Sequence, residues 1–329
     1  MNKKIKLTQF VQTSLIGFNT IVTDQYSQTI ELYDAIPKYV WGNQNRINGK
    51  FLDPIIRPFK HKGKDYIAKI TPAAVEVSKG EFKYFFPSQR EELVEDALRK
   101  LASDGQGVFL QDKLEKNSLP MASVLFTLYE LQKELKRMGH SYNINQIKES
   151  LNICANTGVI LESTQGSGVI ISNIFDTLGL ESKDDVGNGK ATKCFVRFNL
   201  LVTKSINDKT YRLLNYDACM SYKKSLARWL HKRMSHNYRQ ASLRKPYTIH
   251  LSTIIRDSGI TASKRIATTL QRIESALDEL KDSKMILMFE VEKILSDKLV
   301  DAKIVIYPDS KFVSDIIKGN KLNKKSEIT

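Results

Sequence analysis

The sequence predicts an α+β protein: tandem winged-helix domains with a short β-rich extension at the N-terminus. Three observations predict this fold. First, a helix, a helix-turn-helix and a strand pair follow one another twice along the chain. Second, the predicted helices carry apolar residues at a period near 3.6, as a buried helix face requires. Third, the segments after them are rich in β-branched and aromatic residues, which favours strands.

In the N-terminal extension, alternating apolar and polar residues predict short strands within Thr29–Val40 and Phe51–Ile70. The basic run Lys60–Lys64 contains a glycine and predicts a turn between strands. We interpret residues 1–86 as this extension and residues 87–206 as the first winged-helix domain. Residues 207–310 are then the second winged-helix domain, and residues 311–329 form a basic tail that we expect to fray over Lys318–Thr329.

The first copy begins at a capping box, in which Ser88 is followed three residues later by Glu91. Its elements are predicted as a helix to Leu101, a second helix over about Met121–Met138, and a strand-like lead-in with a short helix from Ser141. The segment Ala155–Ser163 then completes the helix-turn-helix. The predicted wing consists of Val169–Phe175 and Lys193–Leu201, joined by a flexible loop at Ser182–Lys190.

The second copy begins with a basic stretch, Met220–Tyr247, that contains no Asp or Glu. Its first half predicts an amphipathic helix with Trp229 on the apolar side and the row Lys224, Arg228 and Lys232 on another side. A solvated charged surface is the alternative interpretation of this row. The remaining predicted elements are a lead-in at Tyr247–His250, a short helix at Leu251–Ser258, a long helix at Ser263–Leu280, and wing strands at Met285–Val291 and Ala302–Tyr307.

The long helix divides into two faces. Its apolar residues fall within about 40 degrees of one line on a helical wheel; they are Ile266, Leu270, Ile273, Leu277 and Leu280. The opposite side carries side chains that can hydrogen-bond base edges or phosphates: Lys264, Arg265, Thr268, Gln271, Arg272 and Ser275. A recognition helix inserted in the DNA major groove fits this division, and an exposed polar face on a structural helix is the alternative.

The composition points to a polyanionic partner. The chain has 329 residues, 41% of them hydrophobic, a net charge of +15 and a pI near 9.5. Such a charge attracts nucleic acid or an anionic membrane. Membrane is the weaker alternative, because no apolar run approaches the roughly 18 residues of a membrane span. We expect a cytoplasmic protein, since polar residues interrupt the N-terminal arm and the three widely spaced cysteines suit a reducing compartment.

Motifs for catalysis are absent from the sequence. It contains no phosphate-binding GxxxxGK[ST] loop and no HExxH pair, and its cysteines and histidines lack metal-ligand spacing. We therefore expect no catalytic residues, no metal and no cofactor. The residues predicted to contact DNA lie in the basic stretch and the long helix: Lys224, Arg228, Lys232, Arg233, Arg239, Arg244, Lys245, Lys264, Arg265, Thr268, Gln271 and Arg272.

Three stretches resemble the initiator proteins of iteron-regulated bacterial plasmids: Glu31–Tyr39, Phe86–Leu101 and, most specifically, Ser225–Ala241. The resemblance covers about residues 30–310. It implies tandem winged helices that bind direct repeats in double-stranded origin DNA, open the neighbouring duplex and recruit host replication proteins such as an initiator and a helicase. It also implies a switch between monomers and a homodimer that represses its own gene. The short, apolar segment Ala155–Ser163 departs from this pattern and favours dimerisation or phosphate contact over base reading.

Two alternatives stay open at this stage. A winged-helix transcriptional repressor has the same fold and binds DNA without initiating replication. A replication nickase or primase is the alternative from the enzyme class, and the missing histidine cluster argues against it.

Overall fold

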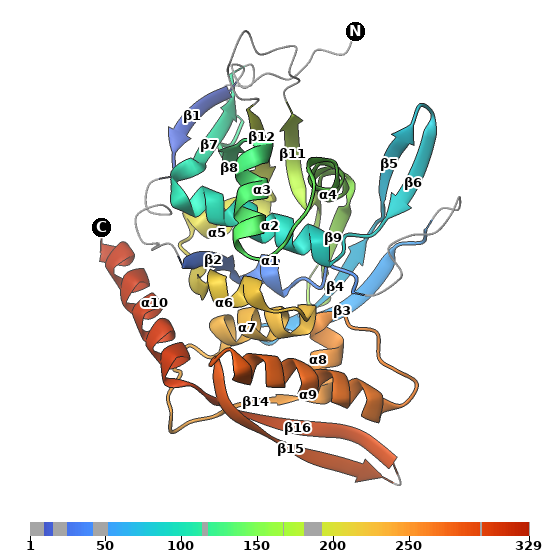
Figure 1. Cartoon of the computed structure of the whole chain (residues 1–329), viewed down its shortest axis with the longest axis vertical. Coiled ribbons are helices and arrows are strands. Elements are labelled where there is room, and N and C mark those ends of the chain that lie inside the picture. The colour runs from blue at the N-terminus through green and yellow to red at the C-terminus, as the bar shows by residue number, and fades with distance from the viewer. Residues whose placement is uncertain are drawn as a thin grey trace.

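The computed structural model describes residues 10–15, 25–41, 52–113, 118–166, 168–180, 193–296 and 298–328. Two hydrophobic cores divide the described chain between Met220 and Tyr222. We call residues 10–220 the N-terminal unit and residues 221–328 the C-terminal unit. Figure 1 shows them stacked along the long axis of the molecule. The α+β fold with winged helices that the sequence predicts is confirmed.

The N-terminal unit contains three sheets and a separate antiparallel hairpin of two strands. Its strands are β1 (Phe10–Ser14), β2 (Tyr26–Ile30), β3 (Ile55–His61), β4 (Lys64–Ile70), β5 (Ala73–Ser78), β6 (Glu81–Phe85), β7 (Gly107–Asp112), β8 (Met121–Phe126), β9 (Gly158–Ser163), β10 (Val169–Asn173), β11 (Phe175–Leu180), β12 (Cys194–Phe198) and β13 (Tyr211–Asn215). They are ordered β1-β7-β8-β12-β11, β10-β9-β4-β3, β13-β2 and β5-β6.

The helices of this unit cover the sheets (Figure 1). They are α1 (Glu31–Ala35), α2 (Gln89–Leu101), which continues into a widened turn at Ala102–Gln106, α3 (Leu128–Arg137), α4 (Ile144–Asn156), α5 (Leu200–Asn207) and α6 (Tyr216–Ser221). The predicted capping box at the start of α2 is confirmed, because the Ser88 backbone N–H donates to Glu91 Oε2 at 2.8 Å.

The helix-turn-helix of the first copy lies earlier in the chain than the sequence predicts. Met121–Met138 is not one helix: the strand β8 precedes α3, which begins at the Thr127 capping box. The second helix is α4, whereas most of Ala155–Ser163 is the strand β9, so that prediction is wrong. The residues of β9 alternate between buried and half-buried, and the strand pairs with both β4 and β10. Period-two burial between two partners decides for a strand.

The wing of the first copy is the hairpin β9–β10, not the predicted pair. The predicted second wing segment, Lys193–Leu201, contains β12 and the start of α5. The strand β12 pairs with β11. The predicted flexible loop at 182–190 lies outside the described residues.

The described part of residues 1–86 is built into the N-terminal unit. The strand pair β3–β4 is confirmed, with its turn at Lys62 and Gly63, both at positive φ. The predicted strand within Thr29–Val40 is corrected, since β2 ends at Ile30 and α1 follows. Arg99 of α2 holds this helix, because its Nη2 lies 2.7 Å from Asp34 Oδ1.

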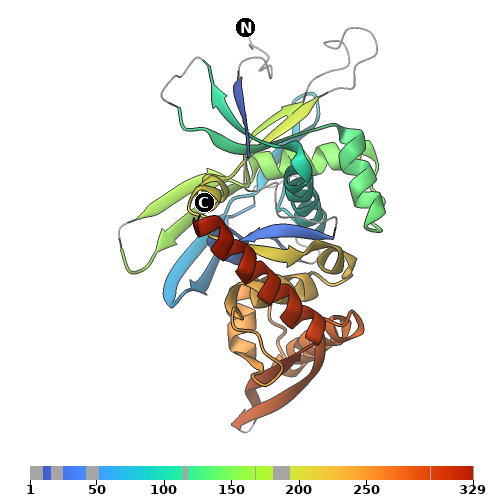
Figure 2. The same cartoon turned by 90° about the vertical axis from the view of Figure 1, so that its left-hand side faces the viewer.

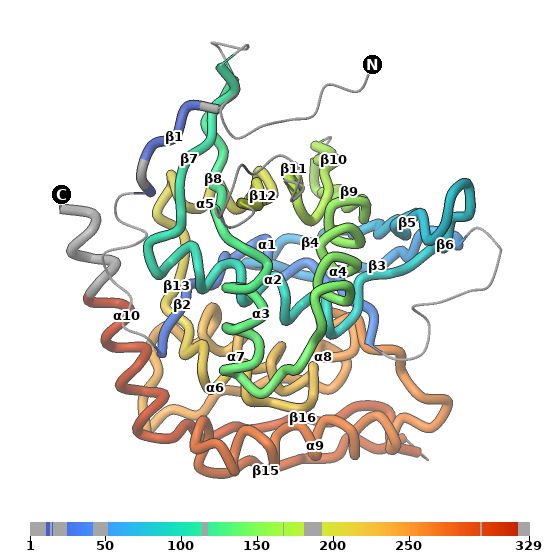
Figure 3. The backbone as a smooth tube through the Cα atoms, turned by 45° about the horizontal axis from the view of Figure 1, so that its top comes forward, coloured from blue at the N-terminus to red at the C-terminus, as the bar shows by residue number. Residues whose placement is uncertain are grey.

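The C-terminal unit follows the predicted order. Its elements are α7 (Ser225–Asn237), β14 (Tyr247–His250), α8 (Leu251–Ser258), α9 (Ile266–Asp282), β15 (Ile286–Ser296), β16 (Lys298–Pro308) and α10 (Ser310–Ile328). The strands form one sheet ordered β14-β16-β15. Figure 3 shows α9 running along the β15–β16 hairpin at the far end of the unit. This arrangement is a winged helix whose hairpin is the wing.

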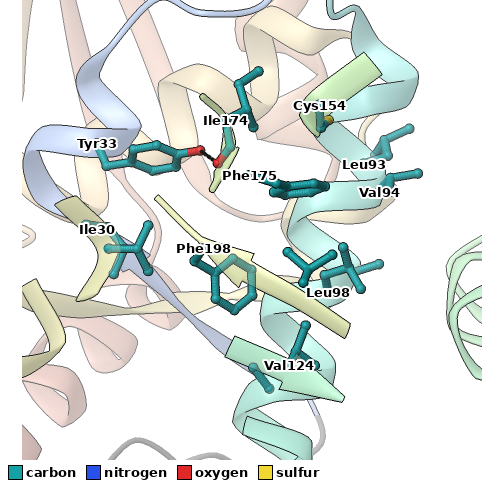
Figure 4. Packing of buried hydrophobic residues seen from close by; sticks show 14 of the residues in the cluster. Ile30, Tyr33, Leu93, Val94, Leu98, Val124, Cys154, Ile174, Phe175 and Phe198 are labelled. Carbon is teal, nitrogen blue, oxygen red and sulfur yellow. Dashed lines mark hydrogen bonds between the residues drawn. The ribbon is translucent and has the colours of Figure 1, made fainter. Parts of the chain in front are cut away.

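Each unit has its own hydrophobic core. In the N-terminal unit, Leu98, Val124 and Phe198 are completely or almost completely buried (Figure 4). The Tyr33 hydroxyl in the same cluster donates to the carbonyl of Ile174 at 3.2 Å. The thiols of Cys154 and Cys194 are buried as well. No helix in the described ranges is long and apolar enough to cross a membrane.

The C-terminal segment corrects one more prediction. Residues 311–329 are predicted as a basic tail that frays over Lys318–Thr329, whereas Ser310–Ile328 is the helix α10, which extends along the molecule beside β2 and β13 (Figure 2). Phe312 and Ile316 are buried in the core of the C-terminal unit. Tyr26 of β2 donates its hydroxyl to Asp315 Oδ1 at 2.6 Å. The helix therefore ties the C-terminal unit to the N-terminal unit.

Candidate nucleic-acid interface

The helix α9 presents a polar face to solvent. Its predicted apolar stripe is confirmed, because Leu270, Ile273, Leu277 and Leu280 are buried in the second core and Ile266 packs against it. A helix with this stripe inside must turn its other side outward. The exposed side chains on or just before that side are Lys264, Arg265, Thr268, Gln271 and Arg272. The structure therefore brings these five predicted residues together on one accessible surface, which we call the α9 face.

The start of α9 is preceded by cations and has no acidic residue in its first turn. The helix begins at Ile266, three residues later than predicted, so Lys264 and Arg265 precede its first turn. Because the N-terminus of a helix carries a partial positive charge, two cations there do not stabilise the helix, and an anion would. Among the described residues, neither Lys264 nor Arg265 has an ion-pair partner. The arrangement suits a phosphate group from outside the chain.

Arg272 is partly engaged. Its Nη1 donates to the carbonyl of Thr261 at 3.1 Å, which fixes the side chain across the loop before α9. Thr269 is buried in that same region, and its hydroxyl oxygen accepts a hydrogen bond from the backbone N–H of Ser263 at 2.8 Å. The loop is thus held by side chains of the helix. The other Arg272 donors stay available on the exposed face.

The basic row on α7 is corrected by the structure. Arg228 is fully buried; its Nε lies 3.3 Å from Glu92 Oε2, and its Nη1 donates to the carbonyl of Tyr222 at 2.7 Å. Lys232 Nζ lies 2.7 Å from Asp96 Oδ2 and 3.3 Å from Glu92 Oε1. Both acidic residues belong to α2 of the N-terminal unit. In this arrangement the two cations hold the units together and are not accessible to DNA.

The ion pairs change the protonation chemistry of Lys232. Burial by itself would lower the pKa of its ammonium group, but the carboxylates of Asp96 and Glu92 raise that pKa well above its usual value. The lysine therefore stays charged, as its role in the buried contact requires.

The other predicted residues of the basic stretch divide between the interior and the surface. Arg233 contacts Asp257, with Nη1 at 3.0 Å from Oδ2, and its guanidinium lies 5.2 Å from the Trp229 ring. Arg239, partly exposed, is paired with Glu31 of α1. Lys224, Arg244 and Lys245 are exposed, and none of them has an ion-pair partner among the described residues. Of the residues of this stretch that were predicted to contact DNA, these three are exposed without an ion-pair partner in the described ranges, and Arg239 is exposed but paired.

The N-terminal unit contains a polar helix face that the sequence analysis missed. On α4, Asn145, Gln146 and Lys148 are exposed, and we call this surface the α4 face. The opposite side of the helix is buried and carries Ile147, Leu151 and Cys154. Asn and Gln are the side chains that pair with adenine in a major groove. The signal was present, since Asn143 and Gln146 form a capping box and the buried residues recur at positions i, i+4 and i+7. The polar face of α4 is not predicted because the sequence analysis assigns the second helix to Ala155–Ser163 instead.

An open hollow of about 530 Å³ lies between α3 and the residues that lead into α4. It is lined by Tyr129, Gln132, Lys133, Lys136 and Ser141–Asn143. Both lysines are exposed, so the hollow adds positive charge next to the α4 face. In the described part of the chain, no group of three or more His, Cys, Asp or Glu side chains is arranged to hold a metal ion.

Comparisons with known proteins give a fold. No family model and no curated protein matches the sequence. The crystal structure of RctB domains 2-3 is similar with a TM-score of 0.50 and 11% identity, covering 86% of this chain and 99% of that one. A selenomethionine structure of RctB domains 2 and 3 has a TM-score of 0.49 and 12% identity, covering 80% and 93%. The crystal structure of the Pi initiator protein in complex with iteron DNA has a TM-score of 0.44 and 11% identity, covering 67% of this chain and 91% of that one. At such identities the likeness to RctB domains 2-3 shows a shared fold.

Proposed function

We propose that this protein binds repeated sites in double-stranded origin DNA and initiates replication of a plasmid. The observation that carries the proposal is the α9 face. Its five exposed polar side chains lie on α9 or just before it, in the winged helix of the C-terminal unit. An α-helix fits the major groove, and Arg, Thr and Gln side chains can hydrogen-bond base edges there. The net charge of +15 supports a polyanionic partner.

Two helices rather than one reach the DNA in this proposal. The α4 face and the α9 face belong to different units, which the buried contacts of Arg228 and Lys232 with α2 hold together. Repeated sites suit a protein that carries two reading helices on units joined by buried ion pairs. We further propose that origin opening requires host replication proteins, and that the protein acts as a binding protein without catalysing strand cleavage or primer synthesis.

The experiment that tests the proposal is a footprint of the purified protein on the DNA that flanks its gene. We expect protection of regularly spaced direct repeats. A fragment that carries them should replicate in a host when the protein is supplied in trans. Protection of a single palindrome, without replication, would favour the repressor alternative. Cleavage of the fragment in the presence of a divalent metal would instead favour the nickase.

The interface residues are tested with paired variants. Arg265→Ala and Asn145→Ala change exposed residues of the two helix faces and should both weaken binding to the protected repeat. Lys281→Ala changes an exposed lysine in the last turn of α9 and is the control. If all three variants bind the repeat as the unchanged protein does, neither helix face contacts DNA.

A further inference from the structure

The tip of the β15–β16 wing exposes apolar side chains. Leu295 is 69% exposed and Val300 is 53% exposed. Pairing between the two strands runs from Ile294 opposite Asp301 to Leu295 opposite Leu299, which leaves Val300 as the extra residue of a bulge. Bulges change the direction in which side chains leave a strand. The tip is therefore shaped differently from the rest of the hairpin. Leu295 and Val300 are its most exposed aliphatic side chains, and the neighbouring Ile294 is 42% exposed.

Packing within the protein does not account for these two side chains. Leu299 is partly buried against the second core, and Ala302 and Ile304 are buried in it. Leu295 is paired with Leu299 and Val300 follows Leu299 in the strand, yet both side chains remain exposed. Strand edges and hairpin ends usually carry polar residues because exposed apolar ones promote association. An apolar tip therefore indicates a contact with another molecule.

Two lysines beside the tip favour an anionic partner. Lys293 and Lys298 flank the two aliphatic residues; both are exposed, and neither has an ion-pair partner in the described part of the chain. Figures 1 and 3 show the hairpin tip at the same end of the unit as the start of α9, where Lys264 and Arg265 lie. Nearer the base of the hairpin, Lys303 Nζ neutralises Glu292 at 2.9 Å. Two exposed lysines without an ion-pair partner among the described residues thus flank the apolar side chains. The same hairpin also carries acidic residues: Asp297 lies between the two lysines in the sequence, and Asp301 accepts a hydrogen bond from the Ser252 hydroxyl at 2.7 Å.

We propose that Leu295 and Val300 form a wedge that enters the minor groove beside the major groove read by α9 and partly unstacks one base step. The inference rests on the proposed duplex binding. Minor-groove proteins insert aliphatic side chains between base pairs, and the contacts made by the bent duplex offset the cost of unstacking. Lys293 and Lys298 hold the phosphates on either side of the inserted residues. The wedge gives the binding protein a direct means of weakening base pairing next to its site.

The test compares two places on the same strand. The double variant Leu295→Ser/Val300→Ser removes the wedge. Leu287→Ser removes an aliphatic side chain that is 60% exposed on the same strand, at the other end of the hairpin, roughly 27 Å away along the strand. Leu295→Phe keeps a large apolar group at the tip. All three positions are exposed, so thermal unfolding should show that each variant folds as the unchanged protein does.

The probe is a duplex recovered from random sequences by selection on the unchanged protein, with 2-aminopurine placed at successive positions. Unstacking raises the fluorescence of this base, and energy transfer between dyes at the duplex ends reports bending. We expect the unchanged protein, Leu287→Ser and Leu295→Phe to raise the fluorescence at one step beside the core of the site and to bend the duplex. The double variant should lose the fluorescence rise and most of the bend while still binding the selected sequence.

Two results would overturn the inference. The wedge is wrong if the double variant keeps the fluorescence rise, or if the unchanged protein binds the duplex with no rise at any position. A tip that serves a protein partner would give the second result. If selection enriches no sequence and the protein binds no duplex, the proposed function itself fails. That outcome is distinct because it appears with the unchanged protein, before any variant is made.

Discussion

The helices α7 and α9 each have cations beside an apolar stripe, and the two sets of cations have opposite surroundings. Each combines an apolar stripe with several cations, and each lies in the winged helix of the C-terminal unit. On α7 the cations Arg228 and Lys232 are buried against Glu92 and Asp96 of α2. On the α9 face, Lys264 and Arg265 are exposed and have no acidic partner among the described residues. A basic row therefore predicts an anionic partner but does not say whether that partner is DNA or the same chain.

The difference has an energetic consequence. Charges in a buried pair have lost their hydration, and only their partners make up for it, so removing one partner is costly. Exposed charges keep their hydration, and removing one changes the stability of the fold by little. Substitutions on α7 should therefore act on stability, and substitutions on α9 should act on DNA binding.

The largest effect is expected at Lys232. Lys232→Met leaves Asp96 and Glu92 without their ammonium partner in a buried site and should lower the free energy of unfolding by about 3–5 kcal/mol. The measurement is urea unfolding followed by circular dichroism. Lys264→Met, on the exposed side of the comparison, should change the same quantity by less than about 0.5 kcal/mol. Equal small losses in both variants would mean that the α7–α2 contact is open in solution.

A second variant separates the ion pair from packing. Adding Asp96→Leu to Lys232→Met removes the stranded carboxylate and should recover part of the lost stability, because an apolar pair of similar size often replaces a buried ion pair without cost. If the double variant is less stable than Lys232→Met, the loss comes from packing and not from an unpaired charge.

The next effect depends on pH and, of the two helices compared, concerns α7. Burial lowers the pKa of His231 to about 3 and that of His236 to about 4. An unfolded histidine has a pKa near 6.5, so below that pH the unfolded state binds more protons. The contribution of each ring to stability is complete above pH 6.5 and is lost as the pH falls toward the folded value. At pH 5 each ring should cost about 2 kcal/mol.

The measurement compares unfolding free energies at pH 7 and pH 5 for the unchanged protein and for His236→Gln. His236 Nε2 lies 2.7 Å from the Thr29 hydroxyl oxygen, and glutamine retains a group that can form this hydrogen bond. The variant should lose about 2 kcal/mol less between the two pH values than the unchanged protein. The same loss in both proteins would show that His236 is not buried in its neutral form.

A smaller free-energy change is expected at Arg265, and it concerns recognition. Arg265→Ala should leave unfolding unchanged and lower the ratio of specific to random-DNA affinity about tenfold, since a bidentate Arg–guanine contact contributes about 1–3 kcal/mol of discrimination. Competition binding with the protected repeat and its scrambled version measures this ratio at one salt concentration. A proportional loss for both DNAs would mean that the α9 face holds phosphates and that bases are read elsewhere.

The smallest effect is expected in the salt dependence of binding. Lys264→Ala should make the slope of log affinity against log salt shallower by about 1, because each phosphate contact releases about one counterion. Lys224→Ala is the informative comparison, since Lys224 is exposed while its neighbours on α7 are buried. An unchanged slope for both variants would exclude these two lysines from the contact with the phosphate backbone.

The sequence by itself determined the local features of this protein. The capping box at Ser88, the turn at Lys62 and Gly63, and the buried stripe of α9 were all predicted correctly. Trp229 was placed on the buried side of its helix, where it is 8% exposed. These features depend on residues a few positions apart, whose spacing fixes which side chains share a face or bond one another. Local spacing was therefore sufficient.

Only the tertiary structure decided the features that depend on distant residues. Whether 158–163 is a helix or a strand depends on β4 and β10 as its partners, and a short apolar segment is compatible with either. Whether Lys232 meets water or a carboxylate depends on Asp96, 136 residues earlier in the chain. Sequence periodicity shows that a residue lies on a particular side of a helix. It does not show what lies opposite, and for a charged side chain the opposing group decides whether it holds the fold together or remains available for a ligand.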